Sequence, residues 1–94
     1  MHRTVYRMNI TRAEFERLLP GALGGVAHAV DGDVFSGRDG ALEWSIRLGS
    51  EEVSRIGLVR LALREVTIEL RGCDDAGAKA FMHRFDLYFR KGGG

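Results

Sequence analysis

The sequence has very little cysteine, and this shortage narrows the range of functions. Cys73 is the only cysteine in 94 residues, so no disulfide can form within the chain, and a reducing compartment is expected. The Cys/His spacings of zinc domains are absent as well. We therefore expect a cytoplasmic protein that uses no cofactor and no metal.

An excess of one charge and long apolar runs are also lacking. Fourteen basic residues against 13 acidic ones leave a formal net charge of +1, whereas nucleic-acid binders usually carry a larger basic excess. Twelve of the basic residues are arginine, which suits bidentate anion recognition but also fits a GC-rich bacterial genome. No stretch approaches 18 apolar residues, and residues 1–6 lack the apolar run of a signal peptide, so no membrane association is expected.

Motifs of catalysis and phosphate binding are missing too. The sequence contains no G-x-G-x-x-G, no P-loop and no G-x-S-x-G. Asp31-Gly32-Asp33 resembles the start of a calcium loop, but the later ligands are absent, so a solvated turn is the better interpretation. Cys73 stands beside Asp74 and Asp75, which oppose a reactive thiolate. The sequence leaves catalysis open but favours a non-catalytic protein.

What the sequence does contain is 45% hydrophobic residues, arranged with the periods of strands and helices. Residues 4–10 and 41–48 alternate between apolar and polar positions, which predicts two strands with one covered face. Residues 24–40 give a weaker pattern, which predicts either a loose hairpin around a turn at residues 31–33 or a mobile loop. We expect a loop at residues 49–54, with room for one helical turn at Ser50-Glu51-Glu52.

Two helices are predicted from capping signals and from apolar stripes. Thr11 followed by Glu14 has the form of a capping box, so a helix should begin at Arg12, and Pro20-Gly21 should end or redirect it. A longer amphipathic helix is predicted from residue 76 to residue 90, with two aspartates placed at its positive N-terminal end.

The apolar residues of segment 56–71 change parity along the chain. They are odd-numbered first and even-numbered afterwards: Val59, Leu61 and Leu63, then Val66, Ile68 and Leu70. A continuous strand would run about 50 Å at about 3.3 Å per residue, which is too long for a small domain. We therefore expect two strands joined by a bulge or tight reversal at Arg64-Glu65.

Together these elements predict one α+β domain over residues 1–94, with the order β-α-(β)-β-β-β-α. We expect an antiparallel sheet of four or five strands with both helices packed on one face. The predicted core consists of Tyr6, Met8, Ile10, Phe15, Leu18, Leu19, Trp44, Ile46, Leu48, Val59, Leu61, Val66, Ile68, Leu70, Phe81, Phe85 and Phe89.

The function that we rank first is a non-catalytic protein-interaction or accessory module, bound to an unidentified protein partner or to a second copy of itself. Leu87 falls off the main apolar stripe of the second helix, close to His83 and Arg84, and an apolar residue there suits a partner contact.

Two alternatives stay open. Four arginines at outward strand positions form a candidate nucleic-acid-binding face: Arg47, Arg60, Arg64 and Arg71. The interleaved acidic residues and the lack of outward aromatic residues weigh against this interpretation. The C-terminal glycines Gly93 and Gly94 are typical of carrier proteins whose terminal carboxylate is activated by an adenylating enzyme, although such tails usually follow a strand.

Overall fold

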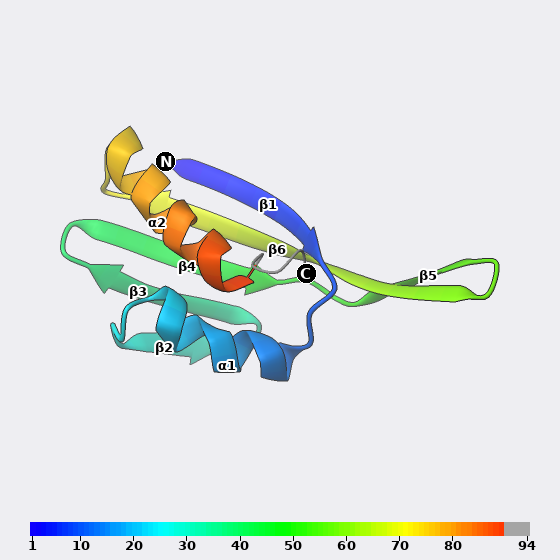
Figure 1. Ribbon diagram of the computed structural model, residues 1–94. Helices are drawn as coiled ribbons and strands as arrows, with labels where there is room; N and C mark the ends of the chain where they lie inside the picture. Colours follow the sequence, from blue (N-terminus) through cyan, green and yellow to red (C-terminus); the bar gives the residue numbers. More distant parts are fainter. Residues whose placement is uncertain (90–94) are drawn as a thin grey trace.

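The computed structural model describes residues 1–89, apart from the side chain of Leu61, and these residues form six strands and two helices (Figure 1). In chain order the elements are β1 (His2–Met8), α1 (Arg12–Ala22), β2 (His28–Asp31), β3 (Val34–Asp39), β4 (Leu42–Leu48), β5 (Glu52–Ile56), β6 (Val59–Arg71) and α2 (Asp75–Phe89). The α+β class with an antiparallel sheet and two helices is confirmed. The predicted number of four or five strands and the predicted order are wrong, because the segment after α1 forms two strands, β5 was not expected, and residues 59–71 form one strand instead of two.

The strands are ordered β1-β6-β4-β3-β2, and β5 pairs with the first part of β6 outside this path. Every pairing is antiparallel. The two helices lie over the same face of the sheet, and β5 with the start of β6 extends away from them (Figure 1). The predicted helical turn at residues 50–52 is wrong, because this segment leads from β4 into β5. The sequence of β5 has no alternating pattern, and β5 forms a strand because its backbone pairs with β6.

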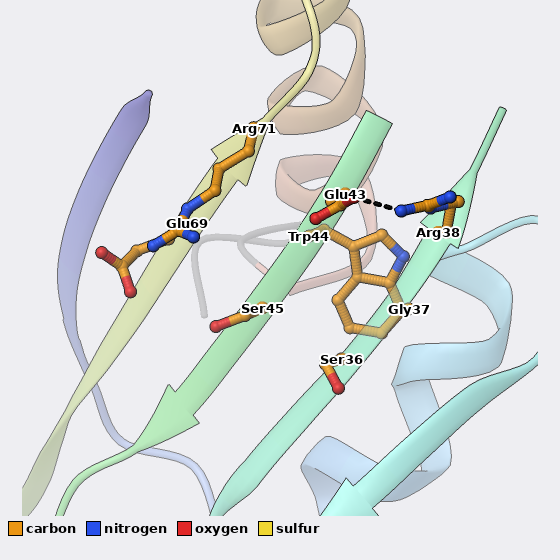
Figure 2. A pocket seen from close by; sticks show the side chains of 8 residues that line it. All are labelled: Ser36, Gly37, Arg38, Glu43, Trp44, Ser45, Glu69 and Arg71. Atoms are coloured by element: carbon orange, nitrogen blue, oxygen red, sulfur yellow. Dashed lines mark hydrogen bonds and ion pairs between the residues drawn. The ribbon is translucent and has the colours of Figure 1, made fainter. Parts of the chain in front are cut away.

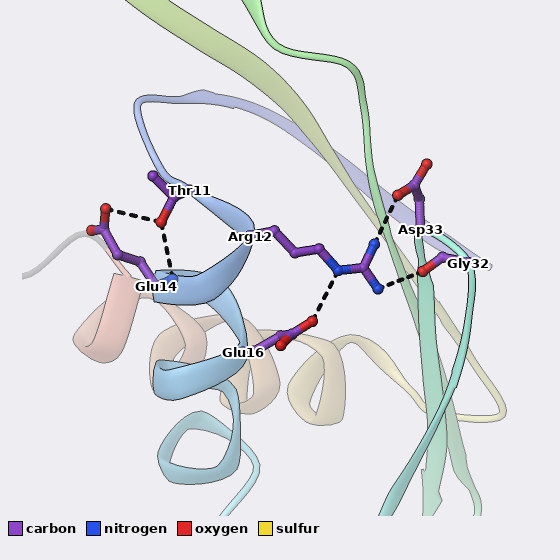
Figure 3. A network of polar contacts seen from close by, with 6 residues as sticks. All are labelled: Thr11, Arg12, Glu14, Glu16, Gly32 and Asp33. Carbon is purple, nitrogen blue, oxygen red and sulfur yellow. Dashed lines mark hydrogen bonds and ion pairs between the residues drawn. The ribbon is translucent and has the colours of Figure 1, made fainter.

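Helix α1 begins where the capping residues predict. The backbone N–H of Glu14 donates to the hydroxyl oxygen of Thr11 at 3.0 Å, which satisfies one of the free donors of the first turn. The Thr11 hydroxyl in turn donates to the Glu14 carboxylate at 3.2 Å. The two side chains therefore bond directly to each other, as Figure 3 shows.

Pro20-Gly21 was expected to end or redirect α1. The predicted end is wrong, because the helix continues to Ala22. A proline in the last turn removes only one backbone hydrogen bond. The helix then ends with the two backbone hydrogen bonds of a Schellman motif. Gly24 N–H donates to the carbonyl of Gly21 at 3.1 Å, and Gly25 N–H donates to the carbonyl of Pro20 at 3.0 Å. Gly24 has a φ of 68°, which favours glycine.

The weakly patterned segment after α1 forms the β2–β3 hairpin, so the hairpin alternative is confirmed. Arg12, the first residue of α1, holds the turn of this hairpin (Figure 3). Its guanidinium donates to Asp33 at 2.9 Å and to the carbonyl of Gly32 at 2.7 Å, while its Nε donates to Glu16 at 2.9 Å. The guanidinium carbon also lies 5.4 Å from the ring centre of Phe35. One side chain thus ties α1 to the sheet.

The core lies between the helices and the sheet. Phe15 is fully buried, with ring centres 4.9 Å from Phe35 and 5.0 Å from Phe89, and Phe89 in turn stacks on Phe85 at 4.3 Å. Most of the predicted core is confirmed as buried or as packed against the buried residues. Four buried residues were not predicted: Ala22, Leu23, Phe35 and Ala78.

One predicted core residue is wrong, and its error has a geometric cause. Val59 is 57% exposed, because β6 is a single strand of 13 residues rather than two strands joined by a bend. At about 3.3 Å per residue it spans about 43 Å, close to the longest dimension of the molecule, 47 Å. The strand does not have to fit inside the domain, because its first part leaves the domain. The side chain of Leu61, also predicted in the core, lies outside the described part of the chain.

Candidate functional site

The feature that stands out on the surface is a two-stranded projection, which we call the arm and define as residues Glu52–Leu63. It consists of β5, the first five residues of β6 and the turn between them. Figure 1 shows it extending beyond the sheet and both helices. All residues from Ser50 to Arg60 are exposed. The arm thus contributes little to the core.

The arm begins at a bulge. Leu48 pairs with Val66, and the next pair is Glu52 with Leu63, so three residues of one strand stand opposite two of the other. Gly49 N–H donates to the carbonyl of Glu65 at 2.7 Å, and a Cβ on Gly49 would lie only 3.1 Å from that oxygen. An extra residue in one strand bends the pair and increases its twist. The bulge marks the point at which the strands leave the body.

The parity of the two strands places apolar residues of the arm on the face away from the helices. Successive side chains of a strand point to opposite faces, and directly paired residues share a face. Val66 is buried under the helices, so Val59 and Leu63, which have the other parity, belong to the face away from the helices. Ile56 pairs with Val59 and therefore shares that face. We call this surface the apolar face of the arm.

The end of the arm exposes large apolar side chains. Ile56 is 69% exposed, Val59 is 57% exposed, and Leu58 in the turn between them is fully exposed. Gly57 has a φ of 61°, which supplies the left-handed residue that a two-residue hairpin turn requires. Three neighbouring apolar residues at the far end of a projection place this surface about as far from the core as the molecule allows.

The reverse face of the arm is basic. Arg55 lies directly opposite Arg60, and Val53 lies opposite Ala62. Within residues 1–89 neither Arg55 nor Arg60 makes an ion pair. The ion pairs at the base of the arm join Arg7 to Glu52 and Arg64 to Glu51. Like charges placed opposite each other across two strands are destabilising. The arm therefore carries an apolar face and, behind it, an uncompensated pair of arginines.

The four arginines predicted as a nucleic-acid-binding face do not share one face. Arg47 pairs with Thr67, and Arg71 pairs with Glu43, so both belong to the side of the sheet that the helices leave open. Arg60 and Arg64 have the opposite parity on β6 and belong to the other side. The side chain of Arg64 is only 15% exposed, and it lies 3.5 Å from the Glu51 carboxylate. The parity change of β6 separates the four residues.

The predicted partner-contact residues of α2 do lie together on its outer side. His83, Arg84 and Leu87 are all exposed, and Leu87 exposes 51% of its surface. Leu87 follows His83 by four residues and Arg84 by three, so it neighbours both on the helix surface. Arg84 also lies against Gly24, where an added Cβ would stand 3.1 Å from the guanidinium carbon. These three residues include one large apolar side chain, fewer than the end of the arm.

The open side of the sheet holds a shallow polar depression of about 440 Å³. Figure 2 shows Arg38 bonded to Glu43 across β3 and β4, with Glu69 and Arg71 on β6 nearby. Charges of both signs alternate across it, as predicted from the interleaved acidic residues. Beneath the depression, the buried indole of Trp44 lies against Gly37. The depression gathers no set of groups of one kind and points to no particular ligand.

Other candidates from the sequence give no assembled site. Cys73 is a partly exposed free thiol. In the part of the chain that the structure describes, no three His, Cys, Asp or Glu side chains lie together in a way that could hold a metal ion. No helix within residues 1–89 has the length and apolar character to cross a membrane. The predicted carrier tail, Gly93 and Gly94, lies outside the described residues.

The chain was compared with protein families, with curated proteins and with solved structures. No family model, no curated protein and no solved structure matches it. The proposed function therefore rests on the geometry of the arm.

Proposed function

We propose that the chain is a non-catalytic protein-interaction module and that the arm is the element that contacts the partner. The observation that supports this proposal is the exposure of Ile56, Leu58 and Val59 at the end of a projection. Contiguous apolar patches on soluble proteins mark contact surfaces more often than isolated apolar residues do. Because the arm adds almost nothing to the core, fold stability alone does not account for these side chains.

The backbone of the arm also supports a contact role. Pairing of β1 with β6 ends at Met8 and Arg64, so within the described residues each arm strand has the other as its only ladder partner. Both outer edges thus offer unpaired N–H and C=O groups, which proteins usually protect or use for strand addition. A ribbon of two strands is marginally stable alone, so a partner would stabilise the arm as well as bind it.

Nucleic-acid binding is the second candidate, and one observation favours it over the others. Arg55 and Arg60 form an uncompensated positive pair, and two-stranded ribbons can enter a nucleic-acid groove. Against it stand the net charge of +1 and the absence of any aromatic residue in the arm. We therefore rank it below protein interaction.

A comparative pull-down tests the proposal. The full chain, tagged at its N-terminus, is used as wild type and as two variants, Leu58→Asp in the arm and Leu87→Asp on α2. Both leucines are exposed, so neither variant should disturb the core. Captured proteins are identified by mass spectrometry, and direct binding is then measured with the purified partner.

The expected result is a specific partner whose binding Leu58→Asp weakens at least about tenfold, the effect of losing an important interface side chain, while Leu87→Asp leaves it unchanged. The reverse pattern would move the contact to α2 and refute the role of the arm. Partners that disappear on nuclease treatment, and that without nuclease are lost as the salt concentration rises, would favour nucleic acid instead.

A further inference from the structure

We propose that the partner of the arm is a second copy of this chain, packed arm against arm, with the two apolar faces in contact around a two-fold axis. This inference rests on the proposed function and names its partner. It follows from the way in which charge and apolar surface are divided between the two faces of the arm.

The outer half of the apolar face carries no charge. Its paired positions hold Ile56 and Val59, with Ser54 one step closer to the body. An uncharged apolar face is complementary to an identical face, because neither copy has to remove water from a charged group to make the contact. A two-fold contact uses the same surface of both copies and closes on itself.

The arginines determine how the two copies can approach. In a contact between apolar faces, Arg55 and Arg60 of the two copies lie on the opposite outer surfaces of two ribbons whose backbones are about 10 Å apart, so their charges are farther apart than the ribbons. Pairing the β5 edges would instead place four arginines on one face of a continuous ribbon. Like-charge repulsion therefore favours face-to-face packing over edge-to-edge pairing.

The size of the patch indicates a weak contact. Ile56, Leu58 and Val59 together expose an area on the order of 400 Å², within the range of the largest apolar patches on monomers and about half of the 800 Å² per partner that standard interfaces bury. An interface this far below the standard size predicts a weak, concentration-dependent dimer. The chain should therefore be monomeric when dilute and dimeric when concentrated.

Sedimentation velocity of the full chain between about 10 µM and 1 mM tests the dimer, since a weak dimer dissociates at the low end of this range and forms at the high end. Val59→Lys is compared with Val53→Lys. The two valines have similar exposure, 57% and 45%, but belong to opposite faces of the arm. We expect Val59→Lys to weaken dimerisation at least about tenfold and Val53→Lys to change it less than about twofold.

A second measurement needs no variant. In a mixture of isotope-labelled and unlabelled chains, isotope-filtered NOE spectra report only contacts between copies. We expect cross-copy signals from the methyl groups of Ile56 and Val59 and none from those of Val53.

The outcomes separate this inference from the proposed function. A chain that stays monomeric at 1 mM while Leu58→Asp still abolishes binding of a different protein would overturn self-association and leave the interaction function standing. Equal effects of the two lysine variants, or cross-copy signals from Val53, would refute face-to-face packing. Normal dimerisation and normal partner binding after Leu58→Asp and Val59→Lys would refute both proposals.

Discussion

The hydroxyl of Tyr6 on β1 donates a hydrogen bond to the carboxylate of Asp86 on α2 at a distance of 2.8 Å. The two residues are 80 positions apart in the chain, and the bond ties the first strand to the last helix. The ring of Tyr6 also stacks near Phe85, with centres 6.1 Å apart. Because β1 is an edge strand that, among the described residues, pairs only with β6, contacts with α2 matter for holding it in place.

Removing this hydroxyl should weaken the fold. Tyr6→Phe keeps the ring and is expected to lower the free energy of unfolding by about 1 kcal/mol, the usual net contribution of a partly buried hydrogen bond. Urea unfolding followed by circular dichroism measures the change. Tyr88→Phe serves as the control, because Tyr88 is 42% exposed. Equal effects of the two variants would contradict a specific role for the bond between Tyr6 and Asp86.

The close approach of Gly37 and Trp44 makes the glycine sensitive to substitution. A Cβ at Gly37 would lie 2.7 Å from the indole ring, and Trp44 is only 2% exposed. Gly37→Ala is therefore expected to cost about 1–3 kcal/mol, as overpacked cores do. In a Trp44→Leu background the same substitution should cost much less. Thermal unfolding of the four chains forms a double-mutant cycle, and a zero coupling energy would contradict the predicted clash.

Phe35 should be one of the most costly positions to truncate. It is fully buried and contacts Phe15. Phe35→Ala is expected to destabilise the protein by about 3–5 kcal/mol through loss of buried area and creation of a cavity. Val30→Ala on the neighbouring edge strand should cost far less, since Val30 is 51% exposed. Chemical denaturation measures both. If Phe35→Ala unfolds the chain entirely, Phe35→Leu is expected to remain folded with a smaller loss.

The opposed arginines of the arm provide a test of its local structure. Arg60→Glu places a carboxylate opposite Arg55 and should stabilise the ribbon by a few tenths of a kcal/mol. Amide hydrogen exchange in residues 53–62 should slow accordingly, while exchange in β4 and the rest of the body stays unchanged. The double variant Arg55→Glu/Arg60→Glu restores like charges and should return exchange to the wild-type rate. Faster exchange in the single variant would contradict the pairing of these two residues.

Much of the body of the fold could be predicted from the sequence. Thr11 and Glu14 located the start of α1, and the alternation around Trp44 located β4, because capping and strand periodicity act over a few residues. Phe35 was missed because it lies in a short segment rich in glycine, where alternation is too brief to read. Its burial depends on Phe15 of α1, which is distant in the chain, and a local pattern does not report such a contact.

The arm could not be predicted because its signal was assigned to the core. The parity change between Leu63 and Val66 predicts a bend only if every apolar stripe faces the same interior. In the structure the strand continues, and its two stripes serve different sides. For the same reason Arg60 and Arg71, grouped in the sequence as one basic face, belong to opposite faces. The α2 contact residues His83, Arg84 and Leu87 lie together as expected, and their role stays a prediction.

The extra residue opposite β6 at Gly49–Glu51 makes the reach of the arm independent of the body. Within the described residues, the two strands beyond the bulge pair only with each other, so residues can be added in pairs without moving any buried side chain. Two added residues in each strand would extend the tip by about 7 Å and keep its orientation, since side chains repeat every second position. One added residue in each strand would turn the tip over and present Ile56 and Val59 on the side now held by the arginines. The length of the arm and the face on which it carries its apolar side chains can thus be changed separately.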